Sequence, residues 1–247
     1  MPVDAASIRA VVCLPTYDER ENLEPMIRAL GEVLDTARDR VLVIDDASPD
    51  GTGAIADRLA SELPWVSVLH RERKEGIGPA YVAGFRWARE AGAELVLEMD
   101  CDFSHDPGDV PRLIEAAEAG ADLALGSRYA PGGGTRNWGL VRRIVSRGGC
   151  VYAQVLLGIR VRDLTGGFKC FRRATLEAID LGALSAHGYA FQIETTYRVR
   201  RAGLHVVEVP ITFVERRAGA SKMTGSIVAE AMWKVPLLRL RALVGRL

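Results

Sequence analysis

Short apolar runs recur through the first half of the chain, and longer amphipathic stretches separate them. Such runs are typical of strands buried on both faces, and we expect strands at residues 11–14, 41–44, 66–69, 95–99 and 123–126. The stretches between them place apolar residues at helical spacing, as Leu23, Ile27 and Leu30 do. This alternation predicts an α/β fold, with a mostly parallel sheet flanked by helices and joined by right-handed crossovers.

The second half of the chain departs from this rhythm. A glycine-rich loop at 130–135 precedes a long helical pattern at 139–157. The later elements are shorter, and we expect a strand at 168–171, a helix at 190–201 and a strand at 206–209. The sheet should therefore continue beyond the alternating half, within the same domain.

The final segment mixes apolar residues with cationic ones. From Ser226 to the end, the apolar positions are accompanied by Lys234, Arg239, Arg241 and Arg246. This composition predicts an amphipathic helix, which Pro236 kinks or interrupts. We therefore expect a single domain at residues 1–223 and, at 224–247, a helix that associates with a membrane surface or with a protein partner.

Composition narrows the possible functions only slightly. The 247 residues are 48% hydrophobic, which is ample for a core, and 32 Lys and Arg balance 32 Asp and Glu, so charge gives no argument for nucleic-acid binding. The four cysteines form no Cys-x-x-Cys pair, which favours reduced thiols in a cytosolic setting. We find no signal peptide and no charge-free apolar run near the ~18 residues that span a bilayer.

Two aspartates follow the most apolar of the predicted strands. Asp100 and Asp102 come directly after the run at 95–99, and alternation places both on one face of an extended chain. Neighbouring carboxylates repel each other unless a divalent cation lies between them. Mg²⁺ and Mn²⁺ commonly take one or two carboxylates and complete their shell with phosphate oxygens and water. The pattern therefore indicates a metal and diphosphate site, although strand-end acids are also common as turn formers.

Acidic pairs also end two other predicted strands, at Asp18-Glu19 and Asp45-Asp46. Parallel strands bring their carboxyl ends to one edge of a sheet, which is where ligands bind in open α/β folds. A carboxylate there can accept hydrogen bonds from a ribose hydroxyl or a base N–H. We therefore expect a nucleotide beside the metal.

The chain lacks both the Gly-x-Gly-x-x-Gly fingerprint and the Walker lysine motif, so side chains must hold the phosphates. The candidates are cations near predicted loops and helix starts: Arg128, Arg142, Arg147, Arg216 and Lys222. No Gly-x-Ser-x-Gly elbow occurs and the four histidines lack metal-ligand spacing, so nothing indicates nucleophilic catalysis.

A series of motifs carries a family resemblance. In chain order they are PTYDE (15–19), VIDDASPDG (43–51), Asp100-x-Asp102 with SHDP (104–107), GSRY (126–129), DLTGGFK (163–169), GYAFQIE (188–194) and RRAGASKM (216–223). From Val11 to Met223 the sequence closely resembles the polyprenyl-phosphate (dolichyl-phosphate) mannosyltransferases, which are inverting family 2 glycosyltransferases of the GT-A (Rossmann-like) fold. The family often has Gln where Ser104 stands.

The resemblance implies transfer of mannose from GDP-mannose to a polyprenyl monophosphate, giving a β-linked product, with Mg²⁺ or Mn²⁺ as cofactor. The residues that it implies around the nucleotide sugar are Pro15, Tyr17, Glu19, Asp46, Asp100, Asp102, Arg216 and Lys222. Asp100 and Asp102 would bind the metal, while Arg128, Arg142 and Ser146 would hold the acceptor phosphate. The residues expected to act on the reacting groups are Asp102, Arg128, Arg216 and Lys222.

Two alternatives stay open from the sequence. One is the same reaction with another nucleotide sugar, such as UDP-glucose. The other is an aspartyl-phosphate phosphatase or receiver-like domain, which needs a lysine beside its strand-end aspartates. Because the acceptor lipid stays in the bilayer, we expect a peripheral protein on the cytoplasmic face of a membrane, bound to lipid or to a membrane-embedded partner.

Overall fold

The computed structural model describes residues 8–184, 188–215 and 225–245. The strands are β1 (Ala10–Thr16), β2 (Asp39–Asp45), β3 (Val66–His70), β4 (Leu95–Glu98), β5 (Leu123–Ser127), β6 (Gly134–Arg136), β7 (Lys169–Arg172), β8 (Val206–Pro210) and β9 (Thr212–Val214). The α-helices are α1 (Leu23–Val33), α2 (Thr52–Glu62), α3 (Ile77–Glu90), α4 (Val110–Glu118), α5 (Leu140–Leu157), α6 (Arg173–Ala178), α7 (Gly188–Arg201) and α8 (Gly225–Leu243). Two 3-10 turns, η1 (Pro107–Asp109) and η2 (Leu181–Ala183), complete the elements.

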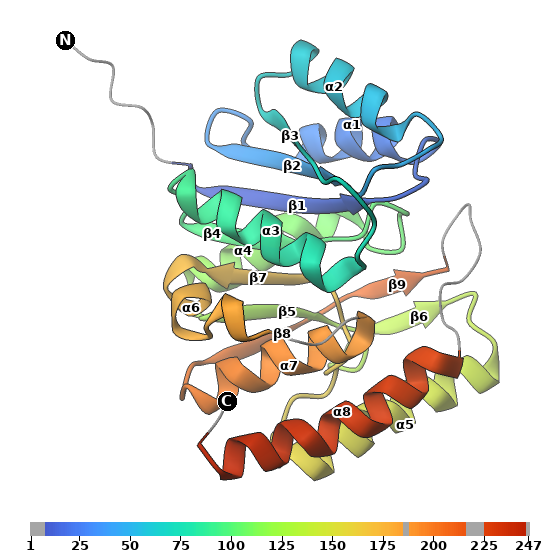
Figure 1. The fold of residues 1–247 in the computed structure, drawn as a ribbon, viewed down its shortest axis with the longest axis vertical. Coiled ribbons are helices and arrows are strands. Elements are labelled where there is room, and N and C mark those ends of the chain that lie inside the picture. The colour runs from blue at the N-terminus through green and yellow to red at the C-terminus, as the bar shows by residue number, and fades with distance from the viewer. Residues whose placement is uncertain (1–7, 185–187, 216–224, 246–247) are drawn as a thin grey trace.

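Seven strands form one sheet in the order β3-β2-β1-β4-β7-β5-β8, and helices cover both of its faces (Figure 1). All neighbours in this sheet run parallel except β7, which is antiparallel to β4 and to β5. Strands β6 and β9 form a separate parallel pair. The predicted α/β fold with a mostly parallel sheet is confirmed.

The core lies in two layers, one on each face of the sheet. Alternate residues of β1 divide between them: Val12 and Leu14 pack with α1, α2 and α4, whereas Val11 and Cys13 pack with α3 and α7. This alternation follows from the two-residue period of a strand, so an entirely apolar strand serves both layers.

Helices α5 and α8 lie side by side at one end of the molecule, away from α1 and α2 (Figure 1). Val235, Leu238 and Ala242 of α8 are buried in a cluster that includes Ala153 and Leu157 of α5. Helix α8 continues through Pro236 without an interruption. One face of the C-terminal helix is therefore part of the core.

The short elements were missing from the sequence prediction. These are β6, β9 and α6, each of six residues or fewer. The strand expected at 168–171 exists as β7, but no sequence pattern indicated that it enters the middle of the sheet. All four cysteines are free and buried, as expected for reduced thiols.

Candidate active site

The loop after β4 carries the two aspartates of the expected metal site. Asp102 is 4% exposed, and its Oδ1 accepts a hydrogen bond from the Ser104 backbone N–H at 3.0 Å. The Asp100 N–H donates to Nδ1 of His105 at 3.3 Å, and the His105 ring stacks on Phe168. Burial lowers the pKa of His105 to about 4. A neutral His105 therefore acts as an acceptor that fixes the Asp100 backbone.

The charges of both aspartates act on one buried hydroxyl, that of Tyr81. The Tyr81 hydroxyl is buried and makes no hydrogen bond to a described residue. Its pKa is raised well above the ordinary value, mainly by burial and then by carboxylates that include Asp100 and Asp102. Both charges thus lie close enough to act on one hydroxyl, as neighbours at a strand end should.

The carboxylates of Asp100 and Asp102 suit a divalent cation that takes its remaining ligands from outside the protein. Within residues 8–184, 188–215 and 225–245 there is no group of three or more His, Cys, Asp or Glu side chains that could enclose a metal. Two carboxylates with diphosphate oxygens and water match the coordination that Mg²⁺ and Mn²⁺ accept. The buried Ser104 Oγ makes no hydrogen bond to any described residue, so one polar atom beside Asp102 is available. The residues present therefore fit the implied metal.

The ends of β1 and β2 bring the expected nucleotide residues together. These strands pair in parallel with Thr16 opposite Asp45, so the segments after them share one edge. The Glu19 N–H donates to Thr52 Oγ1 at 3.1 Å, and Glu19 Oε2 accepts from Asn22 at 2.8 Å. Pro15 lies within β1 itself. The Asp46 N–H donates to the Thr16 oxygen at 3.1 Å, so the segments that carry these residues lie side by side, and their role in nucleotide binding stays a prediction.

Two cations from the loop after β3 cover this edge. Arg71 Nη1 lies 2.5 Å from Asp46 Oδ1, and Lys74 Nζ lies 3.5 Å from the centroid of the Tyr17 ring. Burial raises the pKa of Asp46, and the Arg71 charge opposes this rise. We did not predict these partners. The basic loop was visible in the sequence, but its position over β1 and β2 depends on the strand order.

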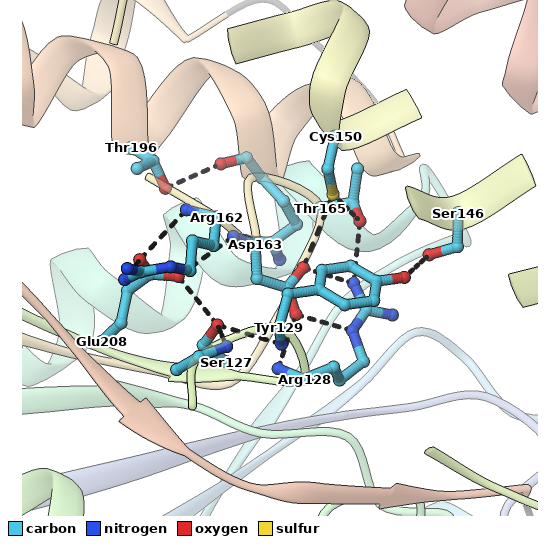
Figure 2. A network of polar contacts seen from close by, with 12 residues as sticks. Ser127, Arg128, Tyr129, Ser146, Cys150, Arg162, Asp163, Thr165, Thr196 and Glu208 are labelled. Carbon is cyan, nitrogen blue, oxygen red and sulfur yellow. Dashed lines mark hydrogen bonds and ion pairs between the residues drawn. The ribbon is translucent and has the colours of Figure 1, made fainter. Parts of the chain in front are cut away.

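Arg128 follows β5 and is held by a buried carboxylate (Figure 2). Its Nε donates to Asp163 Oδ2 at 2.7 Å and its Nη2 to Asp163 Oδ1 at 2.5 Å, while the Arg128 backbone N–H also donates to Oδ2. Nη2 further donates to Thr165 Oγ1 at 2.8 Å. Burial alone would lower the pKa of Arg128, but the Asp163 charge outweighs it and raises the pKa. Arg128 is a fixed cation.

Glu208 on β8 stabilises this pair through hydrogen bonds to Ser127 and to the Asp163 backbone (Figure 2). Its Oε1 accepts hydrogen bonds from Ser127 Oγ at 2.7 Å and from the Asp163 N–H at 3.1 Å. Its Oε2 accepts from the Arg162 N–H at 3.0 Å. Asp163 belongs to one of the motifs that carry the family resemblance, yet the sequence predicted no role for Asp163 or for Glu208. Nothing in the sequence tells which distant acid neutralises Arg128.

The expected acceptor residues Arg142 and Ser146 lie one turn apart at the start of α5. The Tyr129 hydroxyl donates to Ser146 Oγ at 2.7 Å, which brings Ser146 beside the segment that carries Arg128 (Figure 2). The Arg142 guanidinium lies 4.2 Å from the centroid of the Trp138 ring and forms an ion pair with Glu215. The three predicted acceptor-phosphate residues thus occupy one neighbourhood. The candidate Arg147 lies 4.7 Å from the centroid of the Tyr129 ring, whereas Arg216 and Lys222 lie outside the described residues.

A buried pair of charged side chains lies directly before the loop that follows β4. Glu98 and Lys169 are opposite each other on β4 and β7, and both are fully buried. Lys169 Nζ donates to the Gln192 backbone oxygen at 2.9 Å, to Gln192 Oε1 at 2.6 Å and to Thr195 Oγ1 at 2.8 Å. Burial raises the pKa of Glu98 to about 7 and lowers that of Lys169 to about 8. Lys169 is thus occupied within the interior, unlike the lysine that a phospho-aspartate site needs.

This α/β sheet, with acids at the ends of β1, β2 and β4 and cations after β5, has the architecture of a nucleotide-sugar transferase. A family model described as glycosyl transferase family 2 matches residues 11–180. The chain belongs to glycosyltransferase family 2 and is a glycosyltransferase.

Two curated relatives match nearly the whole chain. A polyprenol monophosphomannose synthase of Mycolicibacterium smegmatis is 49% identical over 228 residues, covering 92% of this chain and 85% of the relative. An undecaprenyl-phosphate mannosyltransferase of Micrococcus luteus is 49% identical over 229 residues, covering 92% of this chain and 93% of the relative. The resemblance to the polyprenyl-phosphate mannosyltransferases is confirmed.

A solved structure supports the fold alone. Glucosyl-3-phosphoglycerate synthase of Mycobacterium tuberculosis, in complex with Mn²⁺, UDP and glucosyl-3-phosphoglycerate, superposes with a TM-score of 0.68 at 23% identity. The match covers 97% of this chain and 81% of that chain.

Proposed function

We propose that the chain transfers mannose from GDP-mannose to a polyprenyl monophosphate with inversion, giving a polyprenyl-phosphate β-mannose. The observation that carries this proposal is the pair of 49% identical relatives named as mannosyltransferases acting on polyprenol or undecaprenyl phosphate. Carboxylates that could hold a metal and a nucleotide follow β1, β2 and β4, and Arg128, which could hold a lipid phosphate, follows β5; this arrangement supports the proposal.

The chemistry fits the side chains present. A phosphate monoester has its second pKa near 6, so the acceptor arrives as an anion and needs no general base. Arg128, with its plane fixed by Asp163, and Arg142 would hold that anion together with Ser146. The acceptor oxygen would attack the anomeric carbon in line with the departing diphosphate, which inverts the configuration.

The donor would lie along β1, β2 and β4. Tyr17, Glu19 and Asp46, beside Pro15, would surround the nucleotide, and Asp100 with Asp102 would hold Mg²⁺ or Mn²⁺. When bound, the metal neutralises charge that develops on the leaving diphosphate. Arg216 and Lys222 are proposed to assist at the same place. The role of the protein would be to align two anions that repel each other, the acceptor phosphate and the donor diphosphate.

We place the protein at the cytoplasmic face of a membrane, with the lipid bilayer as the occupant of the outer surface of α5 and α8. All strongly exposed large apolar side chains in the described residues belong to these helices or follow α8 directly. They are Leu140, Val141, Ile144, Val145, Val151, Val155, Met232, Trp233, Leu237, Leu240, Leu243 and Val244. In the described part of the chain, no helix is long and apolar enough to cross a membrane. A lipid acceptor requires the surface to reach the bilayer.

Labelled sugar nucleotides test the reaction. The protein is incubated with GDP-mannose, UDP-glucose or UDP-galactose, with polyprenyl phosphate and with Mn²⁺ or EDTA. We expect label in the lipid only with GDP-mannose and metal, as an acid-labile β-linked product. Transfer from UDP-glucose instead would retain the reaction class and overturn the donor, while absence of all transfer would overturn the function.

A further inference from the structure

Glu215 forms an ion pair with Arg142, one of the cations proposed to bind the acceptor phosphate. It follows β9 and forms an ion pair with Nη1 of Arg142 in the first turn of α5. Its backbone N–H donates to the Arg136 oxygen at 3.2 Å, while the preceding Val214 N–H donates to the Ser104 oxygen at 3.1 Å. The backbone of Glu215 is therefore hydrogen-bonded to β6, and that of the preceding Val214 to the loop after β4 that carries Asp100 and Asp102.

The ion pair is accessible to exchange. The Arg142 side chain is 20% exposed and that of Glu215 is 34% exposed, so neither is sealed in the interior. Arg142 Nε is buried and makes no hydrogen bond to the described residues, and the guanidinium is oriented by the Trp138 ring. A second anion can reach Arg142 only by sharing it with Glu215 or by displacing the carboxylate.

We propose that Glu215 is an exchangeable anion that makes the Arg142 site selective for a phosphate monoester over a phosphodiester. This inference rests on the proposed function, because it assigns the acceptor phosphate to Arg142. A monoester carries about −1.5 to −2 charges at neutral pH with three free oxygens. A diester carries one charge, as a carboxylate does. The monoester, with its higher charge, displaces the Glu215 carboxylate from Arg142. The diester carries the same single charge as Glu215, which is already bound to Arg142, so it does not displace the carboxylate.

The reaction itself converts one ligand into the other. A phosphate oxygen of the acceptor forms a bond to the anomeric carbon, and the bond from that carbon to the diphosphate oxygen breaks. The diphosphate leaves with the electron pair, and no proton is exchanged with the protein. The lipid phosphate thereby becomes a diester with one charge fewer. Glu215 then returns to Arg142, which favours product release and opposes rebinding.

The test compares Glu215→Gln with the wild type, using a short, water-soluble polyprenyl phosphate and its mannosylated product. We expect the inhibition constant of the mannosylated product to fall by about three- to five-fold in the variant. The reason is that the variant lacks the partly exposed carboxylate that competes with the product for Arg142. The acceptor KM should fall by less, so the ratio of the two constants changes. As the pH falls through about 6, the wild-type acceptor KM should rise more steeply than that of the variant, because the acceptor becomes a monoanion.

Glu62→Gln is the matched control, since it removes a charge from another exposed ion pair, 3.0 Å from Arg58 on α2. It should leave both constants unchanged, while Glu215→Asp should retain the selectivity. A second measurement needs no variant: an alkyl phosphate should inhibit the wild type at least about ten times more strongly than the dialkyl phosphate, from the charge difference. Equal inhibition by both, or a variant that behaves as the wild type, overturns the inference while transfer itself still stands. Absence of wild-type transfer to any polyprenyl phosphate overturns the proposed function instead.

Discussion

At the scale of single residues, the proposed acceptor site depends on Asp163 as much as on Arg128. An arginine with free rotamers would bind a phosphate only after losing conformational freedom. Asp163 removes that loss in advance, because two hydrogen bonds from the guanidinium fix its plane, and a third, from the Arg128 backbone N–H, holds the Asp163 carboxylate in place. Glu208 in turn fixes Asp163 through its N–H. The cation is thus oriented before any ligand arrives.

Asp163→Asn should destabilise the fold. Asp163 is fully buried and Arg128 is 7% exposed, so the variant leaves an arginine charge in the interior without its counterion. Breaking a buried pair in this way costs about 3–5 kcal/mol, which urea unfolding can measure. Asp57→Asn, at a 62% exposed carboxylate, is the control and should change the free energy of unfolding by less than about 1 kcal/mol. A loss below that level for Asp163→Asn would contradict the buried-pair argument.

Asp102→Ala should abolish transfer and leave the fold intact. The variant removes a proposed metal ligand, so charge on the leaving diphosphate is no longer neutralised. It also removes one of two mutually repelling carboxylates, so the metal-free protein should not lose stability. Initial rates with saturating substrates measure the effect, and Glu115→Ala, an exposed acid on α4, serves as the control. Retention of more than about a tenth of the wild-type rate would count against the metal role.

His70 should give a small pH dependence of stability. A hydrogen bond to Asp57 at 2.8 Å raises its pKa above the ordinary 6.5, and burial lowers it by less. The charged form is thus favoured in the folded state, so the stabilisation is complete below pH 6.5 and is lost as the pH rises through the raised value. The unfolding free energy of the wild type minus that of His70→Gln should therefore fall from pH 5.5 to 9. Because the His70 side chain is about half exposed, this change in unfolding free energy will be small. A difference between wild type and variant that stays constant or rises with pH would refute the prediction.

At the scale of elements, α5 joins the reaction to the proposed membrane surface. Its first turns carry Arg142 and Ser146, while Leu140, Ile144 and Val151 expose apolar side chains from the same helix. Helix α8 extends this apolar surface with its own exposed stripe, which is separate from its buried stripe at Val235 and Leu238. Removal of α8 would open a core cluster, so single substitutions on its exposed face are the better test.

Trp233→Glu and Ile144→Glu should each weaken binding to anionic lipid vesicles by about tenfold, because a buried apolar contact is replaced by an anion that the surface repels. Sedimentation with vesicles measures the binding. Ala54→Glu places the same charge on an exposed position of α2, at the other end of the molecule, and should have no effect (Figure 1). If all three variants bind as the wild type does, a membrane-embedded protein partner becomes the better occupant of this surface.

The elements also show what the sequence could and could not predict. Apolar runs such as Val41–Ile44 predicted buried strands because their composition alone requires burial on both faces. Strands β6 and β9 were missed because each has only three residues, none of them buried, and so carries no periodic signal. The acids after β1, β2 and β4 were found at strand ends, but Asp163 and Glu208 were not, since their partners lie 35 and 81 residues away in the chain.

At the scale of the whole molecule, strand order arranges the site. The order β2-β1-β4-β7-β5 places the proposed nucleotide residues on one half of the sheet and Arg128 on the other, with the loop after β4 that carries Asp100 and Asp102 between them. The helices with exposed apolar faces lie beyond the half that carries Arg128, and α1 and α2 lie at the opposite end (Figure 1). Under the proposed function, the lipid phosphate would approach from the α5 side and the soluble nucleotide from the other.

This arrangement predicts that metal and nucleotide stabilise the fold only together. Two carboxylates without a third enclosing ligand in the described residues form a weak site for Mn²⁺ alone. A nucleotide diphosphate alone meets the repulsion of Asp100 and Asp102. When both are present, the diphosphate oxygens complete the metal shell, and stabilisation follows the bound fraction, about 2.7 kcal/mol at a ligand concentration of 100 times Kd.

Thermal unfolding with each ligand and with both measures this coupling. We expect little rise in Tm with Mn²⁺ or GDP-mannose alone, a rise larger than the sum with both, and its reversal by EDTA. Asp102→Ala should lose the combined effect and keep its own unliganded Tm, whereas Glu115→Ala should behave as the wild type. Replacing GDP-mannose by UDP-glucose, with the same metal, tests whether the stabilisation depends on the base and the sugar. If Mn²⁺ alone raises Tm as much as the pair does, the carboxylates hold the metal without the diphosphate, and the shared-ligand argument is wrong.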